Sequence, residues 1–106
     1  MTPDDHFDRV ADDLAQRGAV AGAMFGKRAL KAEGKAFACL KGDLLAVKLG
    51  DGTPAHRATL DLTGAELFDP SGKGRPFKDW VAVPVTHAER WQDLAETALD
   101  AVASRS

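Results

Sequence analysis

Residues 34 to 49 read GKAFACLKGDLLAVKL and contain two short apolar segments, Ala36–Leu40 and Leu44–Leu49. Segments of this length and composition are typical of strands. The three residues between them include Gly42, which can supply the positive φ that tight turns often need. A connection this short forces its strands to be antiparallel neighbours. The stretch therefore predicts a β-hairpin within a larger sheet.

The same pattern continues on both sides of this hairpin. Strands are expected upstream at Val20–Phe25 and Ala29–Ala32, with Glu33 and Gly34 forming the next tight turn. Downstream, Glu66–Phe68 and Asp79–Val85 are the remaining candidates. The sequence thus predicts a mostly antiparallel sheet of about five or six strands.

Helices are expected at both ends of the chain. Thr2 can cap a first helix whose apolar residues recur at helical spacing, and a short helix is expected from Pro54 to Leu60. Thr86 and Glu89 fit a capping box for the last helix. Its apolar stripe comprises Trp91, Leu94, Ala95, Ala98, Leu99 and Val102. Terminal helices packed on an antiparallel sheet define an α+β fold, expected as one domain over residues 1–106.

Composition narrows the class of protein. The chain has 106 residues, 44% of them apolar, and a formal net charge of -2, which gives no sign of a dedicated nucleic-acid binder. It has one cysteine and no apolar run that approaches the roughly 20 residues of a membrane span. The N-terminus is acidic where a secretory signal would be basic. We expect a cytoplasmic protein that does not associate with membranes.

Three stretches together resemble the N-terminal domain of the TfoX/Sxy family. They are Ala23-Met24-Phe25-Gly26, then Gly34-Lys35-Ala36-Phe37 followed by Leu44–Leu49, and finally Phe68-x-Pro70 with the segment Gly74–Pro84. The resemblance covers about residues 7–102 and implies a YjbR/TfoX-like α+β fold. The family is named for bacterial regulators of competence that carry a second, helical domain, which we do not expect in this chain. The resemblance implies a regulatory role, and the family has no established catalytic residues that could be assigned to this chain.

The loop from Gly72 to Lys78 is the most suggestive segment. Its glycine amides, together with Lys73, Arg75 and Lys78, are candidates for holding an anion or a partner. It matches no phosphate-binding fingerprint, and the alternative is a solvated turn between strands.

Residues 27–48 form a basic segment that includes Lys31 and Lys35, whereas the first helix is acidic. Such a patch is a candidate for phosphate contacts with a nucleic acid. Lysines that protect sheet edges from aggregation are the ordinary alternative, and exposed aromatic residues for base stacking are not interleaved with them.

No metal, cofactor or catalytic site is expected. His6, His56 and His87 are too widely separated for metal-ligand spacing and are interpreted as surface residues. Cys39 shares strand parity with Phe37, so we expect a buried thiol on the same side of the sheet.

The central strands are apolar on both parities, which leaves three alternatives for the second face of the sheet. Helices cover it, a partner such as a second copy covers it, or its small alanines are simply exposed. The leading prediction is a regulatory or accessory module, without enzymatic activity, that binds protein through the sheet face and the Gly72–Lys78 loop. The alternatives are a nucleic-acid-binding regulator and a protein that binds a small ligand.

Overall fold

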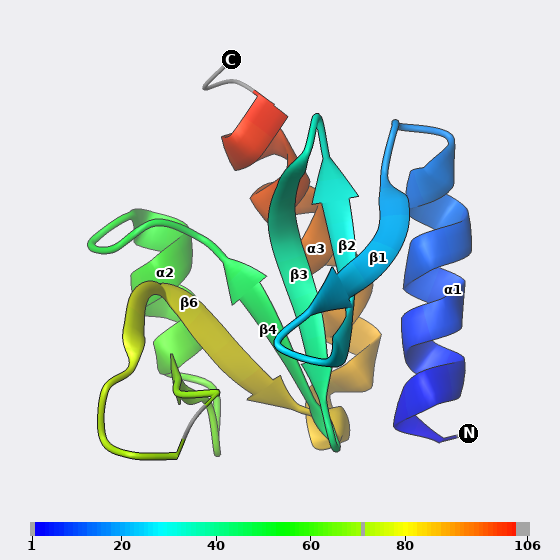
Figure 1. Cartoon of the computed structure of the whole chain (residues 1–106). Coiled ribbons are helices and arrows are strands. Elements are labelled where there is room, and N and C mark those ends of the chain that lie inside the picture. The colour runs from blue at the N-terminus through cyan, green and yellow to red at the C-terminus, as the bar shows by residue number, and fades with distance from the viewer. Residues whose placement is uncertain (1, 71, 104–106) are drawn as a thin grey trace.

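The computed structural model describes residues 2–70 and 72–103 and has an α+β fold, as predicted. A six-stranded sheet has the order β1-β2-β3-β4-β6-β5, with every neighbouring pair antiparallel (Figure 1). The elements are α1 (Pro3–Ala15), β1 (Val20–Met24), β2 (Lys27–Ala32), β3 (Lys35–Lys41), β4 (Leu44–Lys48), α2 (Pro54–Leu60), β5 (Glu66–Phe68), β6 (Phe77–Pro84), a 3-10 turn (Val85–His87) and α3 (Ala88–Ala103).

Two-residue turns join the first three strands. Phe25 and Gly26 have φ of 55° and 73°, and Glu33 and Gly34 have φ of 52° and 79°. Positive φ at both central residues is the signature of the type I′ turn, whose twist matches that of the flanking strands. The chain therefore runs from β1 to β3 as consecutive hairpins.

One face of the sheet, here called the helix face, is covered by α1 and α3. Figure 1 shows α3 passing behind the central strands and α1 alongside β1. The large, fully buried side chains of this core include Phe7, Leu14, Phe37, Leu45 and Trp91. These helices carry the predicted apolar stripes, so their placement follows from the spacing of apolar residues in the sequence.

A bulge in β3 corrects one prediction about strand parity. Leu30 pairs with Ala38, but the next residue, Lys31, pairs with Ala36, so Phe37 is an extra residue without a partner on β2. The bulge puts Phe37 on the helix face, whereas Cys39 lies on the opposite face. The expectation that these two side chains share a side was wrong, because period-2 alternation fails across a bulge.

The opposite face, here called the second face, has a row of small residues at its centre. Successive strand pairings align Gly22 with Ala29, Ala29 with Cys39, Cys39 with Ala46, and Ala46 with Ala82. In this row, the residues that are at most 1% exposed are Ala29, Cys39, Ala46 and Ala82. Phe68 and Trp80 pack in the cluster that contains Cys39, Ala46 and Ala82. The second face is thus covered by aromatic side chains of the same chain, rather than by helices.

The helix starts follow the predictions in part. Thr2 caps α1: its hydroxyl accepts the Asp5 amide at 3.1 Å, and its own amide donates to the Asp5 carboxylate at 3.1 Å. These hydrogen bonds, which favour the ionised form, lower the pKa of Asp5. Thr86, by contrast, lies inside the 3-10 turn that precedes α3, so the capping box predicted there is not formed.

Candidate functional site

A chain of aromatic rings leads from the interior of the second face to its surface. Trp80 lies 6.0 Å from Phe68, Phe68 lies 6.3 Å from Phe77, and Phe77 lies 5.6 Å from Phe25, measured between ring centroids. Trp80 and Phe68 are buried, whereas Phe77 is 36% exposed and Phe25 is 56% exposed. The β1–β2 turn and the start of β6 therefore meet over this face through their aromatic side chains.

The exposed end of this chain of rings lines a hollow of about 410 Å³. We call its lining residues the aromatic patch: Phe25, Lys27, Pro70, Arg75 and Phe77. The patch combines two aromatic rings and a proline with two cationic side chains. Aromatic residues, phenylalanine included, and arginine are enriched at the cores of protein interfaces.

Phe25 is held in a conformation that its side chain does not favour. A bulky residue with φ of 55° is an outlier, because this left-handed region suits glycine, asparagine and aspartate. Glu33 occupies the equivalent position of the next hairpin with φ of 52° and is also exposed. A polar residue is common at an exposed turn of this kind. Phe25, by contrast, has an unfavourable backbone conformation and a ring that is not fully buried.

The glycine-rich loop is organised by its own acidic residue. The Asp69 carboxylate accepts the amide of Gly72 at 3.0 Å and that of Gly74 at 2.8 Å. The Asp69 carbonyl accepts a hydrogen bond from Lys41 Nζ at 3.0 Å. The two amides expected to hold an anion are therefore occupied, so an anion would have to displace this carboxylate.

The five predicted binding residues do not form one site. Arg75 lines the aromatic patch, and Lys73 lies exposed in the same loop. Lys78 is exposed on β6, where its carbonyl accepts a hydrogen bond from His56. Lys31 shares the second face with Ala36, but Lys35 pairs with Ala32, a residue of the helix-face core. Lys31 and Lys35 therefore lie on opposite faces.

Part of the basic segment is neutralised by the acidic helix. Arg28 on β2 forms ion pairs with Asp4, at 3.3 Å, and with Asp8, both on α1. Its guanidinium also lies 4.7 Å from the centroid of the Phe7 ring. The hydrogen bond to Asp8 is the main reason why the pKa of Arg28 is raised. These contacts reduce the positive potential available to a phosphate backbone.

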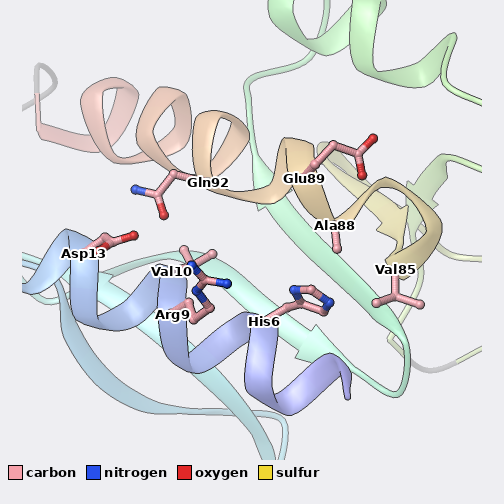
Figure 2. Close-up of a pocket in the computed structure, with 8 residues that line it drawn as sticks. All are labelled: His6, Arg9, Val10, Asp13, Val85, Ala88, Glu89 and Gln92. Carbon is pink, nitrogen blue, oxygen red and sulfur yellow. The ribbon is translucent and has the colours of Figure 1, made fainter. Parts of the chain in front are cut away.

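A second hollow, of about 560 Å³, lies between α1 and α3 and is here called the helix groove (Figure 2). It is lined by His6, Arg9, Val10, Asp13, Val85, Ala88, Glu89 and Gln92. In Figure 2 the Asp13 and Gln92 side chains lie between the two helices, and Glu89 points away from α1. Sequence reasoning named no such convergent polar groups. The sequence feature that could have indicated this groove is the spacing of residues 6, 9 and 13, because it places their side chains beside the apolar stripe of α1.

The histidines and the cysteine have structural surroundings. His56 is only 4% exposed, so its interpretation as a surface residue was wrong: its Nε2 donates to the Lys78 carbonyl at 2.7 Å and ties α2 to β6. The His87 ring bonds the Thr63 carbonyl at 2.8 Å. Burial raises the pKa of the Cys39 thiol, partly offset by Lys27. Within the part of the chain that the structure describes, histidine, cysteine and acidic residues form no group able to hold a metal ion.

Comparisons with known proteins give no relative: no family model, curated protein or solved structure matches this chain. The resemblance to the TfoX/Sxy family therefore stays a prediction. Across residues 2–70 and 72–103, none of the helices has the length and apolar character needed to cross a bilayer.

Proposed function

We propose that this chain is a binding module without enzymatic activity that captures an acidic segment of another protein on the aromatic patch. An apolar side chain of the partner enters the hollow between Phe25 and Phe77. Carboxylates beside it pair with Lys27 and Arg75, which line the same hollow. The charge of the patch thus supports a partner segment that is acidic and partly apolar.

The observation that carries this proposal is the state of Phe25. Its ring is 56% exposed and its backbone has φ of 55°. Backbone conformations of this kind cost on the order of 1–3 kcal/mol and cluster at ligand clamps and other functional sites. A partner that buries the ring recovers apolar area, at about 25 cal/mol per Å² removed from water, without any further ordering of a ring already packed on Phe77.

The resemblance to the TfoX/Sxy family supports a regulatory or accessory role for such a module in the cytoplasm. The family brings no catalytic residues, and the aromatic patch contains no nucleophile or general base beside the two cations. The proposal therefore assigns the patch to recognition rather than to chemistry.

The experiment is a capture of partners from a lysate of the source organism, with and without nuclease, using three matched proteins. These are the wild type, Phe25→Asn and Glu33→Asn. Both substitutions place asparagine at the first central residue of a type I′ turn, where it is favoured. Only the first removes an aromatic ring from the patch.

A protein partner that resists nuclease, and that the wild type and Glu33→Asn retain but Phe25→Asn loses, supports the proposal. The same partner then provides a direct affinity measurement, in which Arg75→Glu is expected to reduce binding at least tenfold by reversing a charge. Equal retention by all three proteins would exclude the patch. If the captured partners were lost after nuclease treatment, the result would instead favour nucleic-acid binding by the basic segment.

A second candidate function is the binding of a small polar ligand in the helix groove. It is favoured by the volume of about 560 Å³ and by the donors and acceptors that two helices contribute to it. Thermal-shift screening of polar metabolites against the wild type and Gln92→Leu tests it. A ligand that stabilises both proteins equally would exclude the groove as its site.

A further inference from the structure

The sequence of the edge strand β1 lacks the features that normally protect a sheet edge. Among residues 2–70 and 72–103 it pairs with β2 alone, and its five residues, VAGAM, carry no charge, no proline and no bulge. Its first four residues are exposed, and Val20 is 63% exposed. Natural proteins usually protect such edges with charges, prolines, bulges or a covering segment, because an unprotected edge pairs with other strands. The opposite edge, β5, has only three residues.

The register of the β1–β2 hairpin determines which backbone groups of β1 face outward. Met24 and Lys27 flank the two-residue turn, so they form a hydrogen-bonded pair. Pairs alternate along an antiparallel ladder, which makes Gly22 with Ala29 and Val20 with Lys31 hydrogen-bonded as well. The amides and carbonyls of Ala21 and Ala23 therefore point away from β2, toward the free edge.

We propose that two copies of the chain pair through β1, antiparallel and centred on Gly22. In this register Ala21 of each copy exchanges two hydrogen bonds with Ala23 of the other, so all four outward-facing residues are paired. The sheet then continues from one copy into the next around a two-fold axis. This inference is independent of the function proposed for the aromatic patch.

Neighbouring registers satisfy fewer groups. A pairing centred on Ala21 would require Ala19 opposite Ala23, but the Ala19 amide already donates to the Leu14 carbonyl at 3.1 Å. A pairing centred on Ala23 would require Phe25 opposite Ala21, but Phe25 has left-handed backbone geometry and cannot extend the strand. Only the register centred on Gly22 uses both outward-facing residues of each copy.

The side chains of β1 favour a second copy as the occupant. Gly22 would face its own symmetry mate in a non-hydrogen-bonded pair, where α-carbons approach to about 4.5 Å. Val20 would face Met24 of the second copy, and the two alanines would face each other across the ladder. The charge nearest the two-fold axis in each copy is Lys31 of β2, whose flexible side chain extends over Gly22. One five-residue strand makes a small interface. We therefore expect a weak, reversible dimer.

Light scattering after gel filtration, over protein concentrations of about 10 to 500 μM, tests the association. The wild type is expected to approach twice the 11.3 kDa of one chain as its concentration rises. Ala21→Lys places two like charges near the two-fold axis and should weaken dimerisation at least tenfold. Thr97→Lys on α3 is the matched control, since Thr97 is exposed and lies outside the sheet, and it should dimerise as the wild type does.

Oxidative cross-linking tests the register independently of this variant. A side chain at position 22 would meet only the flexible end of Lys31, whose Cε lies 3.3 Å from the added Cβ, so Gly22→Cys should fold. With oxidised glutathione, Gly22→Cys is expected to form a covalent dimer faster than Ala21→Cys or Ala23→Cys. A constant mass of one chain at all concentrations would overturn the proposal. Preferential cross-linking through position 21 or 23 would overturn the register.

Discussion

The helix face and the second face of the same sheet are both covered, but by different means. On the helix face, α1 and α3 bury large side chains such as Phe37 and Trp91 completely. On the second face, a row of small residues lies beneath Phe68 and Trp80, and the covering side chains end in the partly exposed rings of Phe77 and Phe25.

Under the proposed function, this difference separates stability from recognition. The large core side chains of the helix face, such as Phe37 and Trp91, are completely buried, so they contribute to folding and are not accessible to a partner. Burial on the second face ends at its aromatic patch, where two rings and two cations remain accessible. A partner can complete the burial there without disturbing the helix-face core.

The largest expected effect is the loss of an aromatic ring on the helix face. Phe37→Ala removes a side chain that is 0% exposed and should cost about 3–5 kcal/mol of unfolding free energy. Phe77→Ala, on the second face, removes a ring that is 36% exposed and should cost about 1 kcal/mol. Urea denaturation of both variants measures the contrast. Equal losses would mean that the two faces do not differ in this way.

The second largest loss of unfolding free energy is expected from a larger side chain in the row of small residues on the second face. Ala46→Leu inserts a larger side chain beneath Phe68 and Trp80 and should cost about 1–3 kcal/mol through overpacking. The matched control is Ala58→Leu, at an exposed position of α2, which should be close to neutral. If Ala46→Leu were as stable as this control, the second face would have spare space and its proposed packing would be wrong.

A smaller effect is expected in the loop beside the patch. Asp69→Ala removes the acceptor of the Gly72 and Gly74 amides and should cost about 1–2 kcal/mol. It also frees those amides for another anion. Added phosphate should therefore raise the melting temperature of Asp69→Ala but not that of the wild type. An equal response of both proteins would show that Asp69 does not block anion binding.

The smallest effect concerns Cys39 and pH. Burial raises the pKa of this thiol above its ordinary value of 9.0, so the folded state holds the proton more tightly than the unfolded state. The resulting stability is complete below pH 9.0 and is lost as the pH rises through the folded pKa. The difference in unfolding free energy between the wild type and Cys39→Ala should therefore change above pH 9.0, to the disadvantage of the wild type. A constant difference would contradict this.

Sequence reasoning was most successful where local signals and tertiary structure agree. The helices carry continuous apolar stripes, and short glycine-containing turns force neighbouring strands to pair, so the α+β fold was predictable. Phe37 shows where the reasoning failed, since nothing in its immediate neighbours reveals a bulge. Thr86 shows a second limit, because a 3-10 turn replaced the predicted cap.

The candidate site was predictable only in fragments. Arg75 was named from the loop, but Phe25 and Phe77 are far apart in the sequence and meet only because β1, β2 and β6 belong to one curved sheet. Likewise, the Asp69 carboxylate occupies amides that the loop sequence alone presented as available. Such contacts depend on long-range geometry rather than on local pattern.

The most direct test of the aromatic patch compares Phe25→Asn with Glu33→Asn in one titration against a captured protein partner. Glu33→Asn should raise the unfolding free energy slightly, because asparagine suits the left-handed turn position. Phe25→Asn gains the same backbone relief but loses the ring contact with Phe77, worth about 0.5–1.5 kcal/mol, so its unfolding free energy should change little. The account predicts that Phe25→Asn binds the partner at least tenfold more weakly than the wild type, whereas Glu33→Asn binds it unchanged. Unchanged binding by Phe25→Asn would contradict the assignment of the aromatic patch as the recognition surface.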